Sequence, residues 1–139
     1  MLKSRLVVQV YKDDNKVLVL TQSPTIQRVS QRIILALAPT LADDGVNLAI
    51  RDISQAYVQS ATQLNRTFYV RPPTELTRQM GLPDGSILRV VKPLYGVPEA
   101  GNHWFKTYHD HHTHNLDMVQ STYDPCLLHS TEPFGIVGI

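Results

Sequence analysis

The segment RDISQAYVQS, residues 51–60, places an aspartate and a tyrosine where they could serve metal-dependent phosphate chemistry. Asp52 stands at the far end of an apolar alternation. Hard divalent cations such as Mg²⁺ bind carboxylate oxygens and complete their shell with water and substrate phosphates. The residues that follow can turn the backbone so that its amides face the same phosphates. A lone aspartate at a strand end is also typical of a turn or a helix cap, so both interpretations stay open.

A second group of metal-binding side chains lies in HWFKTYHDHHTH, residues 103–114. His109 and His112 stand one helical turn apart, as do His111 and His114. A zinc site needs three or four converging ligands, and these two pairs point to different faces of a helix. The spacing favours a polar, pH-sensitive helix face over a zinc site.

The composition predicts one ordinary domain of 139 residues, 42% hydrophobic and 18% charged. Its one cysteine, Cys126, cannot form an internal disulfide, which favours a reducing compartment. Cys126 precedes two leucines and is expected to be buried, while Asp124 is expected to be a turn residue before Pro125. No apolar run approaches the ~18 residues of a membrane span, and MLKSRLVVQV lacks the features of a signal peptide.

The formal net charge is +1, but basic residues gather near the start of the chain. Residues 1–36 hold six lysines and arginines against two aspartates, an excess of four. Such a region could face phosphates, or it could be a solvated surface.

The secondary-structure elements that must position these residues follow from hydrophobic periodicity. Apolar runs in residues 5–11 and 17–20, on either side of KDDNK, predict a β-hairpin. Ser23 as N-cap and Pro24 at the first position predict a helix over 24–38 that Pro39 ends or kinks. Alternation in VNLAIRD then predicts a strand that finishes at Asp52.

The second half of the chain has the same alternating character. TFYVRPP and ILRVVKPLYG predict a second hairpin, Pro98 opens a helix that reaches Asn115, and CLLHS and GIVGI predict two last strands. Together these elements predict an α+β fold, an antiparallel sheet with two covering helices.

Several segments in this order resemble copia-type retrotransposon reverse transcriptases. RDISQAYVQS is similar to their first catalytic motif, and the other matching segments, from Lys3 to Leu128, are KSRLVVQVYK, TQSPTIQRVSQRIILALA, TFYVRPP, VVKPLYGVPEAGNHWF and YDPCLL. The resemblance implies that residues 1–139 form an incomplete fingers and palm of a right-hand polymerase.

The resemblance implies a role for each matching residue. Asp52 is the catalytic aspartate that binds two Mg²⁺ ions in the complete enzyme, and Tyr57 is the aromatic gate that excludes the ribose 2′-hydroxyl. Tyr95 and Gly96 flank the incoming nucleotide and template base, and Arg5 reaches the triphosphate. Without the resemblance, Tyr57 reads as a half-buried core aromatic, Arg5 as an exposed strand arginine, and Tyr95 with Gly96 as a turn before a helix.

The same resemblance assigns the backbone after the aspartate to substrate binding, through Ile53, Ser54, Gln55 and Ala56. One departure follows Gly96, where many family members carry a lysine, a glutamine and a proline. This chain has VPEAGN there, and Glu99 is expected to make the nucleotide pocket less positive.

The family's second catalytic element is a hairpin with two adjacent aspartates, and this sequence has no match to it. Its adjacent aspartate pairs, Asp13 with Asp14 and Asp43 with Asp44, lie upstream of Asp52 in polar turns. Because two metal ions need more than one carboxylate, we expect the isolated chain to have no polymerase activity.

The implied partners are an RNA or DNA template and primer, deoxynucleoside triphosphates and the remainder of a retrotransposon polyprotein. A cytoplasmic virus-like particle is the implied location, with no membrane partner. The alternative is an inactive remnant that binds nucleic acid or a protein.

Overall fold

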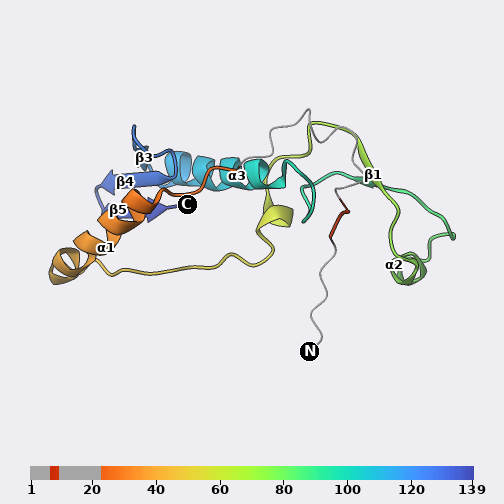
Figure 1. Ribbon diagram of the computed structural model, residues 1–139, viewed down its shortest axis with the longest axis horizontal. Coiled ribbons are helices and arrows are strands. Elements are labelled where there is room, and N and C mark those ends of the chain that lie inside the picture. Colours follow the sequence, from red (N-terminus) through yellow and green to blue (C-terminus); the bar gives the residue numbers. More distant parts are fainter. Residues whose placement is uncertain (1–6, 10–22) are drawn as a thin grey trace.

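The computed structural model describes residues 7–9 and 23–139, and these form a mixed α+β fold (Figure 1). The elements are α1 (Arg28–Asp43), the 3₁₀ helix η3 (Ala56–Gln59), β1 (Phe68–Val70), α2 (Thr74–Gln79), β2 (Leu88–Val90), α3 (Ala100–Asn115), β3 (Val119–Gln120), β4 (Leu127–Thr131) and β5 (Phe134–Gly138). The predicted α+β class is confirmed. The strands form two separate antiparallel sheets, β1-β2 and β3-β4-β5, where the sequence predicted one.

The two sheets lie toward opposite ends of the molecule's long axis. Figure 1 shows β1 and α2 at one end, α1 with β4 and β5 at the other, and α3 running between them. The predicted first hairpin falls largely outside the described residues. Residues 7–9 are described and form no strand.

Helix α1 begins later than the sequence predicted, at Arg28 in place of Pro24. Two backbone N–H groups before it donate to distant partners, Ile26 to the Ile139 carbonyl at 2.8 Å and Gln27 to the Asp124 carboxylate at 2.9 Å. These bonds hold the backbone extended, and Gln27 has φ −68° and ψ 148°. The Ser23 hydroxyl donates to the Gly101 carbonyl at 3.1 Å and does not cap the helix. Tertiary contacts therefore overrode the local start signal.

Of the two alternatives predicted at Pro39, an end of the helix is excluded, because α1 continues through Pro39 to Asp43. Proline lacks the N–H that would bond to Leu35, but its fixed φ near −65° is compatible with a helix. The helix ends at Asp43, and Gly45, two residues later, has the left-handed φ of +81° that is common just after a helix.

The predicted strand over residues 46–52 is absent from the described structure. The segment has no strand partner there, and its apolar alternation does not face a core. Leu48 is 51% exposed and Ile50 is 95% exposed. Alternation alone cannot form a strand, because a strand needs a neighbour for its hydrogen bonds.

The second predicted hairpin is confirmed as β1 and β2, with Tyr69 opposite Arg89. Its connection contains the short helix α2, which the sequence analysis did not predict.

The predicted helix to Asn115 is confirmed as α3, although it begins at Ala100, two residues after Pro98. One side of it carries a row of ring contacts. Trp104 lies 5.6 Å from Tyr108, and Tyr108 lies 4.3 Å from His112, measured between ring centroids.

The two last strands are confirmed as β4 and β5, which pair from Leu127 with Gly138 to Thr131 with Phe134. The short strand β3 completes this sheet. Cys126 and Leu128 are fully buried at its base, which confirms the prediction for the cysteine. Among the described residues, no helix is both long enough and apolar enough to span a bilayer.

Candidate functional site

Three of the residues assigned to the site by resemblance lie together, although two segments of chain supply them. The ring of Tyr57, in η3, lies 4.7 Å from the ring of Tyr95, with an angle of 47° between the planes. Both side chains are half-buried. Gly96 follows directly, so η3 and the turn before α3 form one surface.

A further segment of backbone approaches this surface. The Val8 N–H donates to the Tyr95 carbonyl at 2.8 Å. Gly96 has φ +87°, and a Cβ at this position would overlap the Val8 carbonyl oxygen. Glycine is required here for two separate reasons, a left-handed backbone and a close contact.

The residues between Asp52 and Tyr57 form a tight turn. Gln55 has φ +56° and ψ 36°, and its carbonyl accepts the Val58 N–H at 3.2 Å. The Gln59 side-chain amide donates to the Ser54 carbonyl at 2.6 Å. Ile53 and Ala56 are half-buried, while Ser54 and Gln55 are exposed. The turn is closed by its own local bonds.

Asp52 is exposed and stands on the extended segment before this turn. It does not end a strand, so the prediction of its setting was wrong. Arg5, assigned to the triphosphate, lies outside the described residues.

Helix α3 supports the other end of η3. The Ala61 N–H donates to the Thr107 hydroxyl at 2.9 Å, and a 2.6 Å hydrogen bond joins the Thr62 hydroxyl to His103 Nδ1. Ser60 is fully buried, and within the described structure its hydroxyl has no hydrogen-bond partner. These contacts fix the position of the turn that carries Tyr57 relative to α3.

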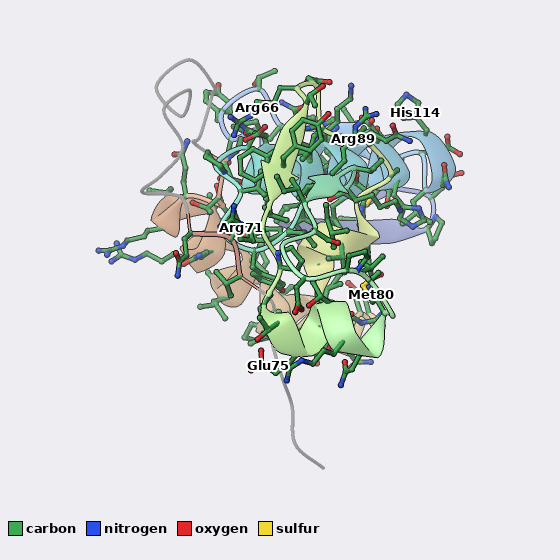
Figure 2. All side chains as sticks on the ribbon, turned by 90° about the vertical axis from the view of Figure 1, so that its right-hand side faces the viewer. Arg66, Arg71, Glu75, Met80, Arg89 and His114 are labelled. Atoms are coloured by element: carbon green, nitrogen blue, oxygen red, sulfur yellow. The ribbon has the colours of Figure 1, made fainter. Side chains whose placement is uncertain are left out.

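Glu99 departs from the family pattern, and the structure gives it a partner. The Arg66 guanidinium donates to both carboxylate oxygens, at 2.7 and 3.1 Å, and Glu99 is 8% exposed. Arg66 also lies over the Phe68 ring, 5.0 Å from its centroid, and is labelled in Figure 2. Arg66 therefore offsets the charge of Glu99, and the effect of Glu99 on a nucleotide pocket stays a prediction. The sequence analysis missed Arg66.

The described residues contain no group of three or more histidine, cysteine or acidic side chains that could hold a metal ion. Among the described residues that the resemblance assigns to the site, Asp52 is the one carboxylate. A two-ion centre needs more carboxylates than this, so the residues present do not fit it by themselves.

The histidine-rich helix follows the sequence expectation only in part. His111 and His114 are exposed, but His103 and His112 are 8% and 6% exposed. His112 Nδ1 donates to the Tyr108 carbonyl at 2.8 Å. The predicted polar face is therefore limited to one side of α3, and the buried histidines serve packing and hydrogen bonding.

Asp124 does more than form a turn, because its buried carboxylate joins three segments. It accepts hydrogen bonds from the Ser30 hydroxyl at 2.5 Å and from the N–H groups of Gln27 and Cys126 at 2.9 and 3.0 Å. Burial acts to raise the pKa of Asp124, but these three bonds outweigh it and the pKa lies below its ordinary value. Burial, with the nearby Asp124 charge, raises the pKa of Cys126 to about 11.

Comparison with known proteins finds similarity to yeast retrotransposon polyproteins. The chain is 29% identical over 99 residues to the Transposon Ty1-NL2 Gag-Pol polyprotein of Saccharomyces cerevisiae, a match that covers 71% of this chain. It is 31% identical over 86 residues to the Transposon Ty1-BL Gag-Pol polyprotein of the same yeast, covering 62% of this chain. The matched stretches span about 5% of the length of these relatives. No family model matches the chain, and no solved structure matches it.

Proposed function

We propose that this chain is part of the RNA-directed DNA polymerase, the reverse transcriptase, of a retrotransposon polyprotein, with elements of its fingers and palm. The observation that carries the proposal is the contact between Tyr57 and Tyr95 beside Gly96. An aromatic side chain five residues after an exposed aspartate is held against the turn that the resemblance assigns to the incoming nucleotide. The similarity to Gag-Pol polyproteins supports the same proposal.

In this proposal Tyr57 selects the sugar. Its ring packs against Tyr95, and the turn that carries it is anchored to α3 by the hydrogen bond from Ala61 to Thr107, so the ring cannot move aside without losing the Tyr95 contact. A ribose 2′-hydroxyl that had to share this space would be excluded by overlap, whereas a deoxyribose would fit.

Asp52 is proposed as a carboxylate that binds Mg²⁺ together with the triphosphate. Mg²⁺ when bound would neutralise phosphate charge during nucleotidyl transfer. Asp52 would contribute one ligand, and its exposed position lets it meet both an ion and the phosphates. The other ligands would have to come from groups outside the described residues.

A second candidate function is a catalytically inactive module that binds nucleic acid or a protein. The observation that favours it is the single carboxylate at the site within the described part of the chain. A module of this kind would keep affinity for nucleic acid without turnover.

Nucleotide binding separates the two candidates. Equilibrium dialysis with dTTP or UTP, with and without MgCl₂, would be performed on this chain and on its Asp52→Asn and Tyr57→Ala variants. The proposal predicts Mg²⁺-dependent binding of dTTP that Asp52→Asn weakens about tenfold, or ~1.4 kcal/mol. Tyr57→Ala should remove the preference for dTTP over UTP. Equal affinities in the unchanged chain and Asp52→Asn would contradict the polymerase assignment.

A further inference from the structure

The outward face of the β1-β2 hairpin combines one aromatic and two basic side chains. Tyr69 lies directly opposite Arg89 in the register and is 62% exposed. Directly opposed residues of an antiparallel pair point to the same face. Arg71, two residues after Tyr69, is also exposed. Figure 2 shows Arg71 and Arg89 at the end of the molecule turned toward the viewer.

The opposite face of the hairpin is turned inward. Phe68, Val70 and Leu88 are half-buried and Val90 is 6% exposed. The hairpin is therefore fixed by its inward face, while its outward face has no protein partner among the described residues. The outward face consists of Tyr69, Arg71 and Arg89 with the exposed side chains of Ile87 and Val91.

The charge of the outward face is of one sign. No acidic residue occurs in either strand or among the residues of this face. The acidic side chains in the connection between the strands are Glu75 and Asp84, and Figure 2 shows Glu75 projecting from α2 away from Arg71 and Arg89. The arginines are therefore available to an anionic partner.

We propose that this outward face binds single-stranded nucleic acid. An exposed aromatic ring stacks on any base, and neighbouring basic side chains bind the phosphates on either side of it. Arginine suits this use, because its planar guanidinium pairs with phosphate oxygens through two hydrogen bonds. A protein partner would use the same exposed apolar side chains, but charge complementarity selects the polyanion.

This proposal adds a nucleic-acid surface to the proposed function. It rests on that function in one respect, the identification of the bound strand as the template. Binding of a nucleic-acid strand by this face does not require that the chain be catalytically active. The face also lies on different residues from those proposed to bind the nucleotide, so the two can fail separately.

The test is fluorescence anisotropy with a labelled single-stranded oligonucleotide at several KCl concentrations. Arg71→Ala/Arg89→Ala is compared with Arg28→Ala/Arg32→Ala, which removes the same charge from exposed positions on α1. The hairpin double variant should lower affinity at least tenfold and reduce the salt dependence of log K by about 1.4, the value for two phosphate contacts on a single strand. The α1 double variant should change both quantities little. Tyr69→Leu should lower affinity about tenfold with an unchanged salt slope.

Circular dichroism of each variant ensures that only folded proteins are compared. Equal losses in the two double variants would overturn the proposal, since they would indicate diffuse attraction to the whole surface. Unchanged affinity in Tyr69→Leu, or self-association of the unchanged chain that Tyr69→Leu abolishes, would overturn it in favour of a protein interface. If the hairpin variants lose the oligonucleotide while Asp52→Asn leaves dTTP binding unchanged, the surface stands and the polymerase assignment fails.

Discussion

Arg66 and Glu99 join the strand region before β1 to the turn that opens α3, through two hydrogen bonds of 2.7 and 3.1 Å. Arg66 stands two residues before β1, and Glu99 directly precedes α3. Because Glu99 is 8% exposed, the carboxylate depends on Arg66 to compensate for its lost hydration.

Glu99→Gln is expected to lower the free energy of unfolding by about 2–3 kcal/mol, because it leaves the Arg66 guanidinium partly buried without its counter-charge. Urea unfolding measures this change. Glu75→Gln, at an exposed position on α2, is the matched control and should change stability little. The double variant Arg66→Met/Glu99→Leu should recover part of the loss. If the double variant lost as much free energy of unfolding as Glu99→Gln does, the pair would contribute more than the neutralisation of two buried charges.

Gly96→Ala is expected to destabilise the fold by more than ~3 kcal/mol, because it combines backbone strain with overlap against the Val8 carbonyl. Gly85→Ala is the matched control. Gly85 has a similar φ of +81°, but a Cβ there would meet nothing within 4 Å. It should cost about 1 kcal/mol from the left-handed backbone alone. Equal losses in the two variants would show that the approach of Val8 does not constrain Gly96.

The Tyr57–Tyr95 contact is expected to couple the two residues energetically. Tyr57→Ala, Tyr95→Ala and the double variant form a cycle, and aromatic pairs typically give ~0.5–1.5 kcal/mol beyond buried area. Thermal or urea unfolding of the four proteins gives the coupling energy. A value of zero would mean that the rings lie together without holding each other in place.

Asp124 should make stability depend on acid pH. Its pKa is lower in the folded protein than its ordinary value of 3.8, so its contribution is present above that pH and is lost as the pH falls through the folded pKa. Asp124→Asn should cost about 3 kcal/mol at pH 7, because an amide cannot accept all three hydrogen bonds. The variant should also lose less stability than the unchanged chain as the pH falls below the ordinary value of 3.8. Asp84→Asn, in an exposed loop, is the matched control and should change stability at pH 7 little.

The Cys126 thiol should be unreactive in the folded protein. Its side chain is fully buried and its pKa is raised to about 11, so little thiolate is present at neutral pH. Colour development with a disulfide reagent at pH 7.5 should require unfolding and should reach one thiol per chain in urea. Immediate reaction without urea would show that the base of the β4-β5 sheet opens easily.

The sequence determined those elements whose local signals and neighbours agree. The β1-β2 hairpin, α3 and the β4-β5 hairpin pair or coil with residues close in the chain, so periodicity was sufficient to find them. The sequence also placed Cys126 in the core, between a turn and two leucines. Asp52 and Tyr57 were singled out by their spacing and by the resemblance. Neither argument predicted which residues lie around them in the structure.

Only the tertiary structure decided what depends on distant partners. The start of α1 moved because Ile26 and Gln27 bond to Ile139 and Asp124, and no local pattern encodes that competition. Residues 46–52 alternate like a strand, but alternation does not supply a neighbour to accept the hydrogen bonds. The pairing of Glu99 with Arg66 likewise joins residues far apart in the chain, and charge counts along a sequence cannot reveal which charges meet. Local propensity therefore determined which helices and strands form. Long-range hydrogen bonds and ion pairs determined where those elements begin and which distant segments are joined.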